Sequence, residues 1–188
     1  DGFLLNRESY FHGIYQWAFY VHIITAPVAL ILGSLLFVNG KRFKGFQSIP
    51  HRTLGKIQVP LVLCGVVPSG IVMSFYAAAG WQAGVGLFLL ALATAGTFSN
   101  ALLKIRQRNY LAHQRWATRC FILLLSPLFL RIVNGFFFLF QIESPIAYQI
   151  NSWASWLVPL MAYEVVLLKQ SVPHFLTNQQ LLFREAEL

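Results

Sequence analysis

Apolar residues gather along this chain into five long runs that are separated by short polar links. The runs cover about residues 14–38, 54–78, 82–104, 117–141 and 149–169. Each run is long enough to cross a bilayer, because a transmembrane helix needs about 20 mainly apolar residues. The pattern therefore predicts an all-α, polytopic bundle of five transmembrane helices that forms one domain over 1–188. The tail 170–188 fits either a short interfacial helix or a disordered segment.

The charges between the runs predict how the bundle is oriented. Cytoplasmic links of membrane proteins carry an excess of Lys and Arg. The segments 39–53 and 105–116 are basic, whereas the links near 79–81 and 142–148 contain no Lys or Arg and only Glu143 as a charge. We therefore expect the two basic links and the C-terminus in the cytoplasm, and the N-terminus outside. The basic residues of these links are Lys41, Arg42, Lys44, Arg52, Arg106, Arg108 and Arg115.

Composition indicates lipid rather than water as the surrounding solvent. Hydrophobic residues make up 57% of the chain and charged residues only 11%, against about 25% charged residues in soluble domains. The formal net charge of +8 lies mainly in the short links, where it suits orientation and contacts with anionic lipid. We therefore expect no nucleic-acid partner. Cys64 and Cys120 both lie within apolar runs, which indicates packing and no disulfide.

Two histidines lie where the basic links end and a span begins. His51 precedes the second span and His113 the fourth, in similar basic surroundings that form a faint internal repeat. If a pseudo-twofold axis relates the two hairpins, both imidazoles converge, as the ligands of a b-type heme do. His51 and His113 would then bind the heme iron, with Arg52 and Arg119 on the propionates. The alternative is two boundary histidines bonded to loop carbonyls or lipid phosphate.

A second pair of polar residues lies within the spans. His22 in the first run and Arg131 in the fourth lie at a similar depth, roughly 21–24 Å from the basic end. An arginine within the membrane normally marks a site or a buried partner. One interpretation is a pocket for a quinone carbonyl or another head group. The other is a structural network of the histidine, the arginine and the backbone.

Glu164 in the fifth run is expected to form a structural ion pair with Arg119. It lies about 7 Å from the inner boundary of its span, near the level of Arg119 and Lys56. A charge at this depth needs a compensating charge. Proton uptake beside a quinone or heme is the alternative role. The chain has no Cys-x-x-Cys, phosphate-binding glycine loop, His-Glu-x-x-His or G-x-S-x-G motif, so enzymatic activity stays open.

Together these positions resemble a known family. The motifs that carry the resemblance, in order, are His22 with Ala29–Gly33, His51-Arg52 with Gly55-Lys56, His113 with Arg115-Trp116 and Arg119, Leu130-Arg131, Trp153, Trp156 and Glu164. Over about residues 18–169 the chain resembles bacterial integral-membrane proteins with a predicted membrane domain of unknown function. The resemblance implies a multi-pass protein of the bacterial cytoplasmic (inner) membrane.

The resemblance also carries two departures and a distant likeness. Members usually have one more helix before the helix with His22, which implies that an N-terminal helix is missing here. His-Arg is commoner in the family than His113-Gln114. The layout is similar to that of transmembrane b-type cytochromes and ferric-reductase-like proteins, which is a likeness of fold alone.

Three functions remain compatible with these features. The first is a redox membrane protein with one heme b at His51 and His113 and a quinone or head-group site at His22 and Arg131. The second is a non-catalytic accessory or scaffold subunit of a larger respiratory or photosynthetic complex. The third is a small-molecule carrier with its site at the His22–Arg131 level. In each case we expect the lipid bilayer and other membrane-protein subunits as partners.

Overall fold

Nearly all of the described chain is helical, as the sequence predicts. This computed structural model describes residues 11–40, 51–77, 79–142 and 144–186, without the side chains of 39, 40 and 171–186, and the described part contains no strand. The predicted roles of Lys41, Arg42, Lys44 and Glu143 lie outside the described residues. The elements are α1 (Gly13–Gly40), α2 (His51–Pro60), the π-helical turn η1 (Leu61–Val66), α3 (Val67–Ser74), α4 (Trp81–Arg106), α5 (Tyr110–Leu139) and α6 (Pro145–Ala186).

Four helical segments are long and apolar enough to cross a membrane. They are Gly13–Val38, His51–Ser74, Trp81–Arg106 and Tyr110–Leu139, and they correspond to the first four predicted runs. The second segment contains α2, η1 and α3, which continue one another without a break. The fifth run lies within α6, which is not among these four segments, so its crossing stays a prediction.

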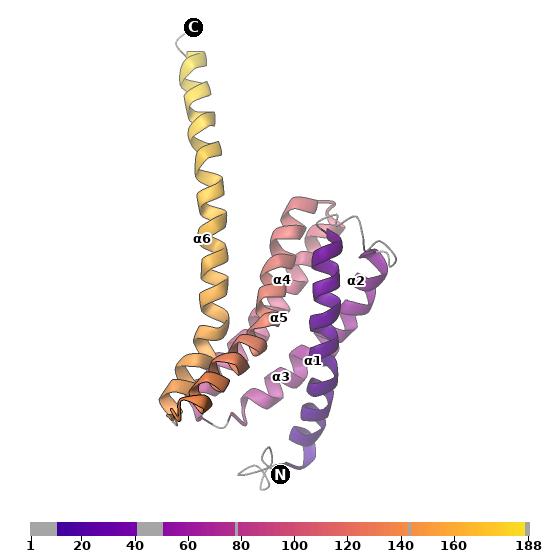
Figure 1. The fold of residues 1–188 in the computed structure, drawn as a ribbon. Helices are drawn as coiled ribbons and strands as arrows, with labels where there is room; N and C mark the ends of the chain where they lie inside the picture. Colours follow the sequence, from indigo (N-terminus) through magenta and orange to yellow (C-terminus); the bar gives the residue numbers. More distant parts are fainter. Residues whose placement is uncertain (1–10, 41–50, 78, 143, 187–188) are drawn as a thin grey trace.

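The helices that contain His51 and His113 begin earlier than the apolar pattern suggests. The apolar runs begin at about residues 54 and 117, just after these histidines, whereas the structure includes both histidines in the first turns of α2 and α5. Polar residues at the end of a membrane helix are not visible to an apolar count, which explains the difference. The tail from residue 170 is likewise no separate element, because α6 continues through Ala186 and extends beyond the other helices (Figure 1).

The first four crossings form a ring of neighbouring helices. α1 packs against α2, η1, α3 and α5, and α4 packs against η1, α3 and α5. Within the described residues, α1 does not contact α4, and α5 does not contact α2, η1 or α3, so these are the diagonals of the ring. This arrangement fits a repeat of two hairpins. α6 lies outside the ring against α4 and α5.

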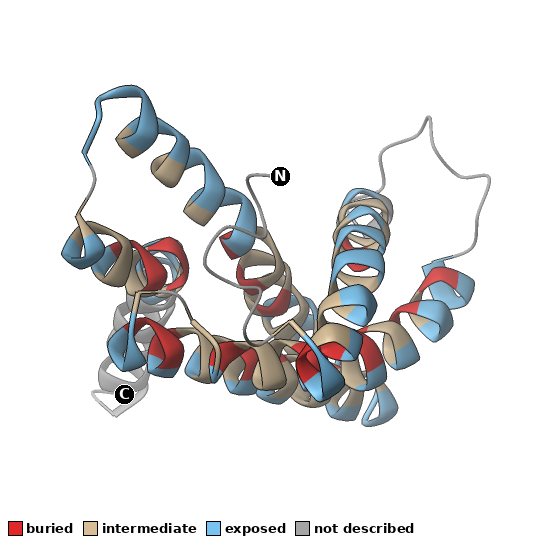
Figure 2. Ribbon diagram, turned by 90° about the horizontal axis from the view of Figure 1, so that it is seen from below, coloured by how far each residue is buried: buried red, intermediate tan, exposed pale blue. Residues whose placement is uncertain are grey.

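The buried residues lie where the helices meet, and the outward surfaces are apolar. Ala29, Val62 and Val67 form a small core, against which Ala95 and Phe98 of α4 pack. Figure 2 shows the burial confined to these contact lines, with exposed residues on the outer faces of the helices. Many of the exposed residues are large and apolar. In lipid such a surface needs no cover, because the solvent is itself apolar.

Glycines allow α4 to approach its neighbours closely. A Cβ atom at Gly84 would lie 2.6 Å from the carbonyl oxygen of Ser74, and one at Gly86 would lie 2.9 Å from Nε1 of Trp153. Real Cβ atoms do not come so near to other heavy atoms, so only glycine fits at these contacts. Small residues of this kind allow the van der Waals packing that holds membrane helices together.

We predict that Gly84→Ala destabilises the protein by about 1–3 kcal/mol, because its methyl group must displace the α3 backbone. Gly96→Ala is the matched control in the same helix, since a Cβ there meets nothing within 4 Å. Thermal unfolding of both variants in detergent, followed by circular dichroism, compares them. Equal melting temperatures for Gly84→Ala and the wild type would contradict the close approach.

Candidate functional site

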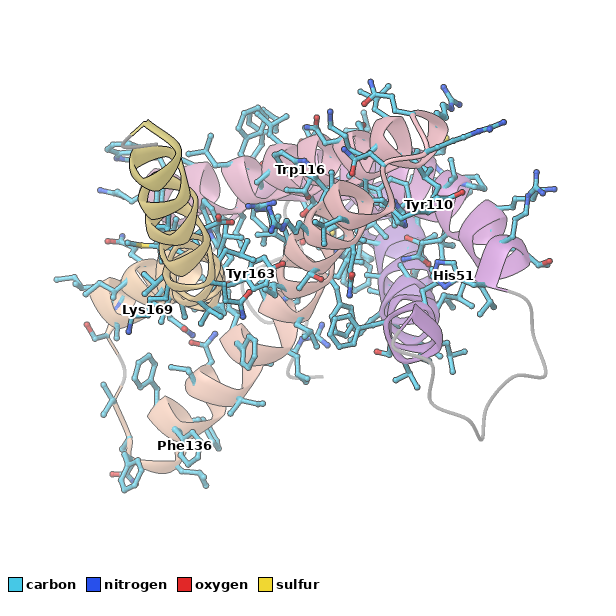
Figure 3. The ribbon with its side chains drawn as sticks, turned by 90° about the horizontal axis from the view of Figure 1, so that it is seen from above. His51, Tyr110, Trp116, Phe136, Tyr163 and Lys169 are labelled. Atoms are coloured by element: carbon cyan, nitrogen blue, oxygen red, sulfur yellow. The ribbon has the colours of Figure 1, made fainter. Side chains whose placement is uncertain are left out.

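His51 and His113 lie at the same end of the bundle on diagonal helices. His51 is the first residue of α2. α5 begins after Asn109, whose side chain caps the helix by accepting a hydrogen bond from the Ala112 N–H, and this places His113 in its first turn. Figure 3 looks down on this end and labels His51 and Tyr110, where the two helices start. The two imidazoles are near enough to interact electrostatically.

The hydrogen bond of His113 determines which ring nitrogen is available. Its Nδ1 lies 2.8 Å from the carbonyl oxygen of Ala101 in α4. A carbonyl can only accept, so Nδ1 carries the proton and Nε2 of the neutral ring has a free lone pair. Histidines that bind metals commonly donate their other N–H to a carbonyl in this way. The His51 ring similarly interacts with the backbone of Leu36 in α1.

A buried amide lies below His51 on the same face of α2. Gln58 is two turns further along the helix and only 2% exposed. Its Nε2 donates to the carbonyl oxygen of Ala29 at 2.9 Å. Its Oε1 has no hydrogen-bond partner among the described residues. Buried acceptors are normally paired, so this oxygen is available to a donor that approaches from the interior.

The ion pair that the sequence analysis expects between Arg119 and Glu164 is present. Arg119 Nε and Nη2 donate to the two carboxylate oxygens of Glu164 at 2.5 and 2.8 Å. The rings of Trp116 and Tyr163 lie 4.7 and 5.8 Å from the guanidinium carbon. This contact joins α5 to α6. It also occupies the face of Arg119 that was expected to hold a heme propionate.

We predict that this pair behaves as a coupled unit. Arg119→Leu and Glu164→Leu should each destabilise the protein by about 2–4 kcal/mol, because each leaves one charge unpaired in the membrane. The double variant Arg119→Leu/Glu164→Leu should be more stable than either single variant. Unfolding free energies from all four proteins in detergent measure this. Additive losses would show that the two charges are not coupled.

His22 is held by a polar network between α1 and α3. Its Nδ1 lies 2.9 Å from Ser69 Oγ, and that hydroxyl donates to the carbonyl oxygens of Gly65 and Val66 at 2.6 and 3.1 Å. A serine has one hydroxyl proton, so Ser69 accepts from His22 Nδ1–H. Nε2 of His22 is therefore an acceptor. The network passes through η1, where Pro60 and the π-turn interrupt the regular helix.

Arg131 is exposed and lies within electrostatic reach of His22. No hydrogen bond or ion pair links its guanidinium to any described residue. The structural network expected for this level thus contains His22, Ser69 and the backbone, without a bond from Arg131. A cation in a membrane span without a protein partner is available to a ligand or to lipid.

The bonds that Gln58, Ser69 and Asn151 make to neighbouring helices are not predicted by any motif in the sequence. Asn151 in α6 donates to the carbonyl oxygen of Leu130 at 3.0 Å and to Asn134 Oδ1 at 2.9 Å, which joins α6 to α5. The signal was a hydroxyl or amide residue within an apolar run. Many such residues bond only to their own helix, so the sequence does not reveal which ones reach a neighbour.

The described residues do not form a multi-residue metal site. Among them, no group of three or more His, Cys, Asp and Glu comes together. A bis-histidine heme is a different case, since the porphyrin supplies the remaining ligands and the protein adds only two imidazoles.

Comparison with known proteins identifies the family. The family described as "Predicted membrane protein (DUF2306)" matches residues 19–167. The chain belongs to this family. The match covers His22, His51, His113, Arg131 and Glu164, and it confirms the resemblance read from the motifs. The family has no assigned function. Membership therefore indicates a membrane protein but does not identify a ligand. Searches of curated proteins and of solved structures give no match.

Proposed function

We propose that the protein is a membrane redox protein that binds one b-type heme between His51 and His113. The observation that supports this most directly is the position of these imidazoles, on diagonal helices at the same end and within electrostatic reach. Diagonal helices face each other across a bundle, so their side chains can approach one ligand from opposite sides. Such a heme would supply one-electron transfer.

Other residues at this end fit the group. Nε2 of His113 has the free lone pair that iron needs, because Nδ1 is held by Ala101. The unpaired Oε1 of Gln58 can accept a hydrogen bond from a protonated propionate. Arg52, which is exposed beside His51, suits an ionised propionate. Arg119 suits this role less well, since its guanidinium is bound by Glu164.

The proposed orientation places this site near the cytoplasm, in the inner membrane of a bacterium. α1 and α4 end, and α2 and α5 begin, at the same end of the molecule (Figure 1). Arg52 lies near the start of α2, Arg106 at the end of α4 and Arg115 near the start of α5. Basic ends of membrane helices remain in the cytoplasm. α6 would form the fifth crossing, since it packs against α4 and α5 and pairs its only described carboxylate with Arg119. The N-terminus is then outside and the C-terminus inside.

The His22–Arg131 pair within the spans suits a ligand head group. Nε2 of His22 can accept a hydrogen bond and Arg131 can donate to an anionic or carbonyl oxygen. A quinone or another small molecule is the ligand we propose there, and a carrier would use the same residues.

An accessory subunit of a larger complex is the alternative to redox activity. The observation in its favour is the exposed aromatic end of α5, where Phe136, Phe138 and Phe140 are all exposed.

We predict that the protein purified from heme-supplied cells shows a Soret band and, after dithionite, a sharp α band. His51→Ala and His113→Ala should each lose these bands, because each removes one of the two imidazoles that would bind the heme iron. His22→Ala should keep them. Reduced-minus-oxidised spectra of the four purified proteins provide the measurement.

Two outcomes would reject the heme. One is a wild-type protein without any reversible band, and the other is loss of the bands in His22→Ala but not in His51→Ala. A colourless protein that co-purifies with other membrane subunits in constant proportion would support the accessory role instead. Size-exclusion profiles of all variants control for misfolding.

A further inference from the structure

An apolar groove runs between α5 and α6 in the halves next to the turn that joins them. Its volume is about 560 Å³, which lies within the range of roughly 300–1,000 Å³ that is usual for small-molecule sites. Among the described residues, no charged side chain lines it. The lining residues that matter here are Phe129, Val133 and Phe137 from α5, and Ile150, Ser155 and Val158 from α6.

Ser155 is the unusual residue in this lining. It is 5% exposed, and its Oγ has no hydrogen-bond partner in the described chain. Serines in apolar helices usually donate to a carbonyl of their own helix. Ser152, one turn earlier, does so, with Oγ 2.6 Å from the carbonyl oxygen of Gln149. The hydroxyl of Ser155 is therefore a buried polar group that the protein itself leaves unpaired.

Pro159 also leaves the backbone carbonyl of Ser155 without its usual helical donor. Pro159 has no N–H and cannot donate to the carbonyl oxygen of Ser155, four residues earlier. Pro127 in α5 likewise has no N–H for the carbonyl oxygen of Leu123. There, however, Ser126 Oγ donates to that carbonyl oxygen at 2.7 Å. At Pro159 the residue in the position of Ser126 is Val158, which has no hydroxyl to donate to the freed carbonyl oxygen. Ser155 thus has an unpaired hydroxyl, and its carbonyl oxygen lacks the helical N–H donor that residue 159 would otherwise supply.

The depth of Ser155 restricts the ligand. This depth rests on the proposed crossing of α6: Ser155 is ten residues from the start of that helix at Pro145, or about 15 Å along it, which is half of the roughly 30 Å hydrocarbon thickness. Charged head groups and ester carbonyls of phospholipids remain near the interface, and their acyl chains carry no polar atom to this depth. The uncharged lining also disfavours an ion. The matching ligand is an uncharged molecule with carbonyl or hydroxyl groups on an apolar body.

We propose that this groove binds the ring of an isoprenoid quinone. The hydroxyl of Ser155 donates to a ring carbonyl of the oxidised form, and the carbonyl oxygen of Ser155 accepts from a hydroxyl of the reduced form. Phe129 and Phe137 line the space for the ring, and the tail leaves past Ile150 and Val158 into the lipid. This site is separate from the His22–Arg131 pair. It does not rest on the heme proposal, because binding requires no heme.

Binding of decylubiquinone to the full chain in phosphatidylcholine nanodiscs tests the proposal. Trp156 is adjacent to Ser155 and is one of five tryptophans, so the part of the fluorescence quenching that Trp156→Phe removes reports occupancy of the groove. Decylbenzene is the matched probe, with a ring and tail but no carbonyl. We expect saturable quenching by decylubiquinone alone. Ser155→Ala should raise the Kd about 3- to 10-fold, the effect of one lost hydrogen bond.

Two further variants locate the site. Ala154→Phe fills the groove and should abolish saturable binding in an Arg131→Leu background, where the His22–Arg131 pair does not contribute. Ser152→Ala changes a buried serine that bonds to its own helix, and it should leave the Kd unchanged. If size exclusion shows that Ala154→Phe misfolds, Val158→Phe replaces it, because Val158 is 62% exposed and tolerates a larger residue.

Three results would overturn the quinone site. The first is that decylubiquinone shows no saturable binding. The second is that decylbenzene binds equally well and competes with decylubiquinone. The third is that Ser155→Ala leaves the Kd for decylubiquinone unchanged. The second would mean that the groove holds only an apolar chain. A colourless protein that still binds decylubiquinone through Ser155 would reject the heme and support this site, so the two proposals fail separately.

Discussion

The requirement that polar groups within lipid find their partners inside the protein governs this structure. Hydrocarbon offers no hydrogen bonds, so each unpaired donor or acceptor is costly. Gln58 donates to α1, Asn151 donates to α5, and Arg119 in α5 binds Glu164 in α6. These bonds connect different helices, and together with the glycine contacts of α4 they determine which faces meet. Apolar attraction alone is weak between helices that are surrounded by lipid.

By the same requirement, polar groups that the described residues leave unpaired indicate where a ligand could bind. Gln58 Oε1 lies below the two histidines at the basic end, Ser155 Oγ lies beside the groove between α5 and α6, and Arg131 lies near His22. Each is next to a place where we propose a ligand. Trp156 Nε1 is also unpaired, and nothing in its surroundings explains it.

The apolar runs, the position of the basic links and the family motifs are properties of the sequence. They determined an all-α membrane protein and the four segments that can span the bilayer, and they indicated His22, His51, His113 and Arg131 as candidate site residues. The pairing of Glu164 with Arg119 could also be predicted. A carboxylate in a span needs a cation at its own depth, and depth follows from residue number at 1.5 Å per residue.

Only the tertiary structure decided which of these residues face one another. Depth gives a level in the membrane but no direction, and direction depends on how each helix is rotated against its neighbours. The order in which the helices pack placed His51 and His113 on diagonal helices. Their rotation bonded His22 to Ser69 instead of Arg131 and left Ser155 unpaired beside a groove. It depends on side-chain contacts between helices distant in sequence, which no local pattern of apolar and polar residues records.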